Sequence, residues 1–246
     1  MKINFGHKGF TLIEVVMAVV IAGILATIAI RSTVTITETG RVEITKTELK
    51  DIGYAISGNP NLENNGIRTD FGYVGDVGAL PTTLNDLLTN PGGYATWNGP
   101  YVKNRFDQTP SDYLEDAWGV AYSYSGVDLT STGSGTNIVH KVGQNTSEFL
   151  LNSVSGNIYD ADGTPPGTIY KDSIVVLLTI PNGAGALVSK GIYPDLGGYF
   201  SYDSIPVGNH DLLIIYQPTN DTLRRLVSVL PNSEHFNSYL LSEELW

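Results

Sequence analysis

The sequence of 246 residues contains no cysteine, which excludes disulfides, thiolate metal sites and cysteine nucleophiles. Charged residues are sparse at 16% of the chain, and basic ones are the scarcer kind, with 14 Lys and Arg against 25 Asp and Glu. The formal charge of −11 argues against nucleic acid as a partner, because phosphate backbones attract basic surfaces.

Signals for catalysis are also missing. The four histidines are scattered without metal-binding spacing, and neither a Gly-rich phosphate loop nor a Gly-x-Ser-x-Gly elbow occurs. Asp160-x-Asp162-Gly163 begins like a calcium loop, but its glycine comes early and Lys171 stands where a glutamate belongs. We interpret that segment as a hairpin turn and predict a protein that is not an enzyme.

What the sequence does contain is one long apolar run near its start. Residues 10–30 carry a single charge, Glu14, and as a helix they would be about 30 Å long, the thickness of a bilayer core. Lys2, His7 and Lys8 precede the run, and no acid does. Positive flanks stay in the cytoplasm, so the pattern predicts a single-pass inner-membrane protein with its bulk on the periplasmic or extracellular side.

Two simpler interpretations of this run explain less. A secretory signal peptide would be shorter, with small residues after its apolar region, whereas Ala26 and Ala29 lie inside the run. A plain membrane anchor accounts for the length but not for Glu14, since a carboxylate in the apolar region costs roughly 2.5–3.5 kcal/mol. A residue that costly is expected to have a partner, such as a positive group on a neighbouring subunit.

The segment Lys8-Gly9-Phe10-Thr11-Leu12-Ile13-Glu14 resembles the processing site of type IV prepilins and of type II secretion pseudopilins. The resemblance implies that a prepilin peptidase cleaves between Gly9 and Phe10 and methylates the new Phe10 amine. It also implies that Glu14 neutralises the Phe10 amine of an adjacent subunit during assembly into a helical homopolymer. The expected partners are therefore other copies of the chain, other pilins and an inner-membrane assembly platform. Processing would remove the leader, residues 1–9.

The helix is expected to extend over residues 10–57. Leu49, Ile52 and Ile56 fall at helical spacing, although residues 33–39 alternate Thr with Val or Ile and alone would indicate a strand. Gly40 is expected to be a weak point within the helix.

Residues 58–152 are predicted to form a globular domain, with a short helix from Thr82 or Thr83 through Leu88 and a strand over 120–125. Several pieces resemble the major pseudopilin of type II secretion, so that the resemblance covers about residues 1–126, although Ala117 replaces the family's proline. The matching pieces are 76–84, Pro91-Gly92-Gly93, Trp97-Asn98-Gly99-Pro100-Tyr101 and Asp116-Ala117-Trp118-Gly119. The resemblance implies a long helix packed on a small antiparallel sheet, with the aromatic residues serving core and turn packing.

The same resemblance implies a calcium site in the loop over residues 127–137. That loop holds one acid, Asp128, whereas calcium takes six to eight oxygen ligands, so Asp128 is a weak candidate and Ca²⁺ a possible cofactor only.

Residues 153–232 read as a separate β-sandwich, because short alternating strands are separated by Gly- and Pro-rich turns. The strands are expected at 156–159, 173–180, 198–202, 210–216 and 226–229. The order of Gly156-x-Ile158-x-Asp160, Gly198-x-Phe200-x-Tyr202 and Ile205-Pro206-x-Gly208 resembles the non-catalytic carboxypeptidase regulatory-like module. Residues 233–246 form a tail that docks on the sandwich or contacts another subunit; the sequence leaves both open.

The expected fold class is therefore α+β, with a long N-terminal transmembrane and assembly helix on a small antiparallel sheet, followed by a β-sandwich. The expected function is a structural subunit of a type IV pilus-like filament, a type II secretion pseudopilus. The alternative is a minor or tip pilin whose C-terminal sandwich binds a surface, a cargo or a partner protein. An adhesive or motility pilus also stays open.

Overall fold

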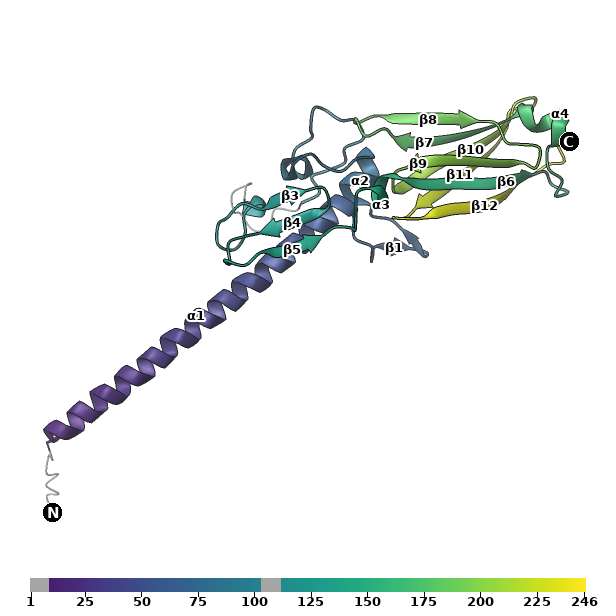
Figure 1. Cartoon of the computed structure of the whole chain (residues 1–246). Helices are drawn as coiled ribbons and strands as arrows, with labels where there is room; N and C mark the ends of the chain where they lie inside the picture. Colours follow the sequence, from purple (N-terminus) through teal and green to yellow (C-terminus); the bar gives the residue numbers. More distant parts are fainter. Residues whose placement is uncertain (1–8, 103–111) are drawn as a thin grey trace, which may run out of the picture.

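The computed structural model describes residues 9–102 and 112–246, which form an elongated molecule. Helix α1 (Leu12–Ser57) projects from one end, a small body packs around its C-terminal part, and a β-sandwich extends beyond that body (Figure 1). We call the described residues of 58–151 the pilin-like body, after the resemblance noted in the sequence; the sandwich begins at Asn152. The start of α1 and the C-terminus therefore lie at opposite ends of the molecule. The α+β architecture predicted from the sequence is confirmed.

Helix α1 runs without a break through the segment whose alternation resembles a strand. Thr33, Thr35, Thr37 and Thr39 each donate their side-chain hydroxyl to the backbone carbonyl four residues earlier, at 2.9–3.1 Å. A threonine hydroxyl bonded in this way fits a helix despite its β-branched side chain. The helix continues through Gly40 and ends at Ser57, as predicted.

The last turns of α1 bury one face against a three-stranded antiparallel sheet, the helix-packed sheet. It consists of β3 (Ser123–Ser125), β4 (Asp128–Ser131) and β5 (Ile138–Lys141). Leu49, Ile52 and Ile56 are almost completely buried, which confirms the predicted helix face. Gly53 lets β5 approach closely, because a Cβ there would lie 2.6 Å from His140 Nε2.

Polar contacts also join the pilin-like body to the same helix. Trp118 Nε1 donates to Glu38 Oε2 at 2.9 Å, and the Tyr122 hydroxyl donates to Glu48 Oε2 at 2.7 Å. These bonds lie nearly three turns of α1 apart, so the body holds the helix at a defined angle.

The remaining elements of the pilin-like body are short. The residues after Thr83 form a 3-10 turn that Thr83 and Asp86 cap reciprocally, where a short helix was expected. Trp97 packs edge-on against Tyr101, whose hydroxyl donates to Asp76, so these aromatics do serve packing. The elements are β1 (Glu63–Asn64), β2 (Ile67–Arg68), α2 (Gly72–Val77), the 3-10 turns Leu84–Leu87 and Asp112–Leu114, and α3 (Ser147–Leu150).

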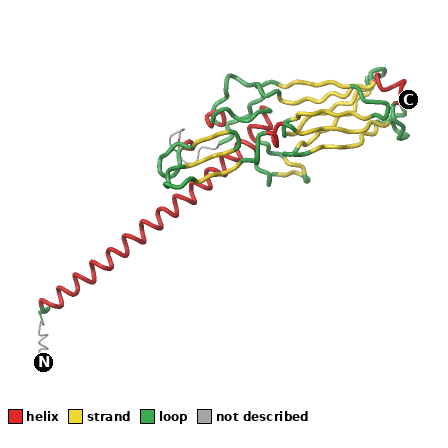
Figure 2. The backbone as a smooth tube through the Cα atoms, viewed as in Figure 1, coloured by secondary structure: helices red, strands yellow, loops and turns green. Residues whose placement is uncertain are grey.

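The C-terminal region consists of two sheets that face each other across one apolar core (Figure 2). The four-stranded sheet, in the order β11-β10-β7-β8, is antiparallel and contains β7 (Ile174–Pro181), β8 (Leu187–Ile192), β10 (Gly208–Tyr216) and β11 (Asp221–Val229). The three-stranded sheet, in the order β12-β6-β9, contains β6 (Asn152–Tyr159), β9 (Tyr199–Ile205) and β12 (Glu234–Leu240). Between β6 and β7 lie α4 (Gly167–Tyr170) and a 3-10 turn, Lys171–Ser173.

Two of these strands were not expected from the sequence. Strand β8 is an edge strand with mostly exposed side chains, and β12 pairs in parallel with β6. Strand β12 belongs to the segment that was assigned to the tail, so the tail docks on the sandwich. Leu241 is buried in the sandwich core, and Trp246 stacks near Tyr170 at its distal end.

The sandwich and the pilin-like body share a tightly fitted junction. Val207, in the turn between β9 and β10, is completely buried in the core of the pilin-like body, and its N–H donates to the Phe149 carbonyl at 2.8 Å. In the turn between β7 and β8, the Gly185 carbonyl accepts from Ala95 N, and a Cβ at Gly185 would lie 2.3 Å from the Tyr94 ring. The junction therefore holds the sandwich in one orientation relative to α1.

Candidate functional site

The candidate site is the segment that leads into α1. Thr11 is the N-cap of the helix, and its side-chain oxygen accepts a hydrogen bond from Glu14 N at 3.4 Å. In return, Glu14 Oε2 accepts from both Thr11 N and Thr11 Oγ1, each at 2.8 Å. This reciprocal capping box satisfies two groups that the first turn of a helix leaves without partners.

The role of Thr11 was missed from the sequence, although the signal was present. Thr11 and Glu14 have the Thr-x-x-Glu spacing that is typical of a capping box just before an apolar helix. Both bonds from Thr11 end on the same carboxylate oxygen, Oε2. The second oxygen of Glu14, Oε1, therefore keeps its capacity to accept hydrogen bonds from a further cation.

Gly9 and Phe10 lie outside the helix, immediately before the N-cap. Both are exposed, with 86% of Phe10 accessible, and no atom lies within 4 Å of where a Cβ on Gly9 would be. The predicted cleavage point is thus exposed and lies outside any helix or strand, so a peptidase could reach it. The structure places Gly9, Phe10 and Glu14 within one short stretch of chain.

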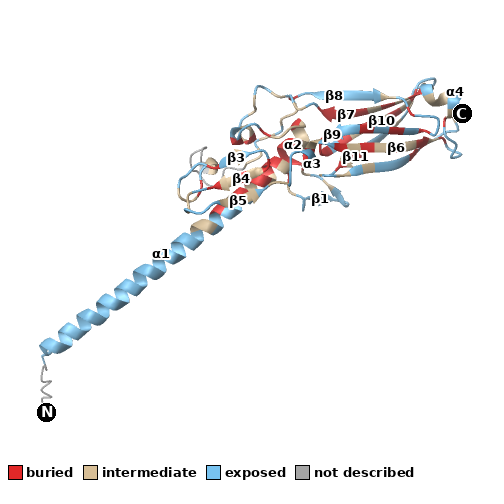
Figure 3. Cartoon of the chain, viewed as in Figure 1, coloured by how far each residue is buried: buried red, intermediate tan, exposed pale blue. Residues whose placement is uncertain are grey.

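The N-terminal part of α1, up to Thr37, packs against no other element in the described part of the chain, and Glu38 is the first residue of the helix that the body contacts. Every residue from 9 to 40 is exposed, and the surface of this part of the helix is uniformly accessible (Figure 3). Within the described part of the chain, α1 is the one helix long and apolar enough to cross a membrane. An apolar helix that is bare on every side needs either lipid or other helices around it.

The weak calcium candidate lies apart from this segment. Asp128 begins β4, and its carboxylate lies 3.5 Å from Lys141 Nζ. Among residues 9–102 and 112–246, no cluster of three or more His, Asp or Glu side chains is placed to hold a metal ion. Calcium binding at Asp128 stays a prediction.

A different acid organises the loop that was expected to hold calcium. Asp116 is buried and accepts hydrogen bonds from Ser131 Oγ at 2.6 Å and from the backbone N–H groups of Trp118, Val120 and Gly133 at 3.0 Å. Burial alone would raise the pKa of Asp116, but these hydrogen bonds outweigh it and hold the pKa below its ordinary value. Asp116 therefore stays ionised and fixes the loop against the helix-packed sheet.

The comparison with known proteins agrees with this geometry. Residues 4–30 match the model of the prokaryotic N-terminal methylation motif. Together with the bare apolar helix and its single acid, this match identifies the class as type IV pilin-like proteins. The chain is also 32% identical over 123 residues to the type II secretion system core protein G of Xanthomonas campestris pv. campestris. The aligned segment covers 48% of this chain and 68% of that protein. The chain therefore belongs to the family of type II secretion core protein G, the major pseudopilins.

Two of the solved structures that resemble this chain have low TM-scores. The dioxygenase domain of a dioxygenase carbohydrate-binding protein fusion from Streptomyces sp. SirexAA-E has a TM-score of 0.30 and 11% identity, covering 39% of this chain and 82% of that one. The Bacillus anthracis TIE protein has a TM-score of 0.30 and 10% identity, and the match covers 46% of this chain and 22% of that one. Likenesses this low carry no argument about this chain, so the resemblance to the carboxypeptidase regulatory-like module stays a prediction.

Proposed function

We propose that this chain is a structural subunit of the type II secretion pseudopilus, cleaved by a prepilin peptidase between Gly9 and Phe10, methylated at Phe10 and polymerised through α1. Membership of the core protein G family supports a filament subunit. The observation that carries the proposal is the apolar run over residues 10–30, which is exposed on all sides and carries Glu14 as its single charge. Family membership also favours a structural role over an enzymatic one.

Before assembly, α1 spans the inner membrane with its N-terminus in the cytoplasm, because Lys2, His7 and Lys8 precede it and no acid does. The pilin-like body and the sandwich then lie on the far side of the membrane. Extraction by the assembly platform would remove the lipid around α1, and burial against the helices of other copies and of other pilins replaces it. Head-to-tail contacts that do not close produce an open helical polymer.

Glu14 supplies the polar contact within this apolar bundle. Cleavage leaves the Thr11 N–H intact, so the capping box and the start of the helix survive processing. The new Phe10 amine of a neighbouring subunit can then approach Oε1, which the bonds from Thr11 do not use. A carboxylate left unpaired in an apolar bundle is strongly unfavourable, so the pairing fixes the axial register between subunits.

The test is Glu14→Val in the full-length protein, with Glu43→Val as the matched control on an exposed part of the same helix. We expect Glu14→Val to insert into the membrane normally but to be absent from sheared filaments, whereas Glu43→Val assembles. Filaments built from Glu14→Val in wild-type amounts would refute the pairing role.

The proportion of the chain in purified filaments separates a rod subunit from a tip subunit. A rod subunit is the dominant protein of the filament, and a tip receptor is rare. The alternative of a minor pilin with a binding sandwich requires the second result.

A further inference from the structure

The outer face of the four-stranded sheet carries an apolar patch. Strands β7 and β10 alternate between core residues and outward residues, and four outward residues are apolar, with Leu177 opposite Leu213 and Val175 opposite Ile215. Leu226 of β11 extends this surface and is 63% exposed. We call these five residues the apolar face. Polar residues such as Thr179, Asp211 and Arg224 border it. An apolar patch with a polar border is suited to a partner.

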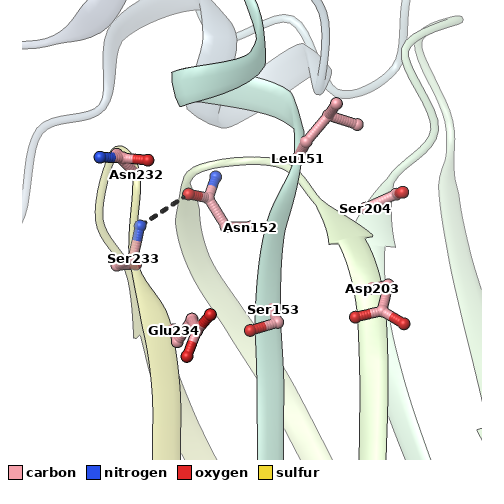
Figure 4. Close-up of a pocket in the computed structure, with 8 residues that line it drawn as sticks. All are labelled: Leu151, Asn152, Ser153, Asp203, Ser204, Asn232, Ser233 and Glu234. Atoms are coloured by element: carbon pink, nitrogen blue, oxygen red, sulfur yellow. Dashed lines mark hydrogen bonds between the residues drawn. The ribbon is translucent and has the colours of Figure 1, made fainter.

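The opposite side of the sandwich has a different chemistry. On the outer face of the three-stranded sheet, Asp203 of β9 and Glu234 of β12 flank Ser153 of β6 and line an open recess of about 500 Å³ (Figure 4). Phe236, on the same face of β12, is 57% exposed. We call this surface, with its two carboxylates and Phe236, the acidic face.

The two faces differ in charge, and Arg224 is the one Lys or Arg of the sandwich strands on the same side as the apolar face. Strands β6, β9 and β12 carry no Lys or Arg, whereas the Lys and Arg residues on sandwich strands all belong to the four-stranded sheet. They are Lys190, Arg224 and Arg225. Arg224 points outward beside the apolar face, bonds to Asp211 at 2.7 Å and keeps 73% of its side chain exposed.

We propose that the apolar face of one subunit packs on the acidic face of a second copy in the filament, with Arg224 directed toward the recess between Asp203 and Glu234. This inference rests on the proposed filament function. A second copy is the occupant that the geometry favours, because the two faces lie on opposite sides of one sandwich. When two copies pack in this way, the acidic face of one and the apolar face of the other stay free for further copies. Such a contact repeats without closing, as a helical polymer requires.

The net charge of the subunit and the fixed orientation of its sandwich also favour a second copy as the partner. Removal of residues 1–9 takes away Lys2 and Lys8 and leaves 12 Lys and Arg against 25 Asp and Glu, a formal charge of 12 − 25 = −13. Two such copies repel each other unless their contact surfaces are neutral or opposite in charge. The Asp211–Arg224 pair makes the apolar face neutral, and Arg224 meets carboxylates on the other side. The junction at Val207 and Gly185 presents both faces in a fixed orientation on every subunit.

The absence of cysteine allows a direct crosslinking test in the full-length chain. Thr222→Cys lies beside the apolar face and Ser201→Cys on the acidic face, and both positions are exposed. Filaments are first sheared, counted by electron microscopy and then treated with a short bismaleimide. We expect a ladder of multimers from the double variant and monomers from each single variant. The control pair, Thr168→Cys with Ser201→Cys, moves one cysteine to the exposed α4 and should stay monomeric.

Each outcome of the crosslinking experiment either supports or overturns the proposed contact. Dimers from Thr222→Cys alone would mean that apolar faces pair with each other, and intact filaments without a ladder would mean that the sandwiches do not touch as proposed; both overturn the inference. Absence of filaments from the wild-type chain would overturn the proposed function itself, and the inference with it.

A second variant tests the contact without crosslinking. Leu177→Glu places a charge in the apolar face opposite Leu213 and Gly191, and we expect filament yield to fall by about tenfold or more, since burying an unpaired charge is costly. Ile169→Glu adds the same charge to α4, where the side chain is 76% exposed, and should leave the yield unchanged. Equal yields from the two variants would overturn the proposal.

Discussion

Val207→Ala tests whether the junction couples the sandwich to the pilin-like body. Val207 belongs to the sandwich by sequence, but its side chain is completely buried in the core of the pilin-like body. Removing two buried methyl groups, with partial relaxation of the cavity, costs about 2 kcal/mol. For a chain of this size that corresponds to a fall in Tm of about 4–8 °C.

The assay can report on the pilin-like body alone. The chain has three tryptophans, of which Trp97 and Trp118 lie in the pilin-like body and Trp246 at the distal end of the sandwich. In a Trp246→Phe background, thermal unfolding of the full-length protein in detergent, followed by tryptophan fluorescence, therefore monitors the body. We expect Val207→Ala to lower that Tm.

The matched control is Val139→Ala on β5 of the body itself, where the side chain is 51% exposed and the expected cost is within about 0.5 kcal/mol. If Val207→Ala left the fluorescence-detected Tm of the body unchanged, the sandwich would be a loosely tethered module and the claim of a fixed orientation would fail.

Three further outcomes are expected. Burial lowers the pKa of His210 below 6.5, outweighing the opposite effect of its hydrogen bond to the Pro206 carbonyl. The stability that neutral His210 contributes is thus present above pH 6.5 and lost as pH falls through the lowered pKa, and His210→Gln should flatten the pH dependence of Tm below pH 6.5. Asp116→Asn should cost about 1–3 kcal/mol in denaturant unfolding, because an amide group cannot accept all four hydrogen bonds. If Asp128 binds calcium, adding Ca²⁺ raises Tm in the wild type and not in Asp128→Asn; equal responses would exclude that residue as a ligand.

The helix and its buried face could be predicted from the sequence because their signals are local. Leu49, Ile52 and Ile56 recur at helical spacing, and the apolar run before them has only one structural solution in a membrane. The strand-like threonine segment was ambiguous by the same rules, and the hydroxyl bonds to preceding carbonyls resolve it in favour of helix.

The strands that were missed depend on distant partners. Strand β12 directs His235 and Asn237 toward the core side of its sheet, so its alternation does not show an apolar face, and its parallel partner β6 lies some eighty residues earlier. Strand β8 is an exposed edge that contains Lys190 and Gly191, which weakens any alternation signal.

The roles of Gly9 and Phe10 in processing and of Glu14 in assembly stay predictions. The structure adds the capping by Thr11, which was overlooked although its spacing is visible in the sequence. The junction could not be predicted, since nothing local to Val207 shows that its side chain enters a core built from residues far earlier in the chain.

The central claim is that the leader is removed so that a new amine can meet Glu14 of a neighbour. Mass spectrometry of the protein in sheared filaments tests this most directly. The account predicts a chain that begins at Phe10 with a methylated amine, and filaments whose subunits still begin at Met1 would contradict it.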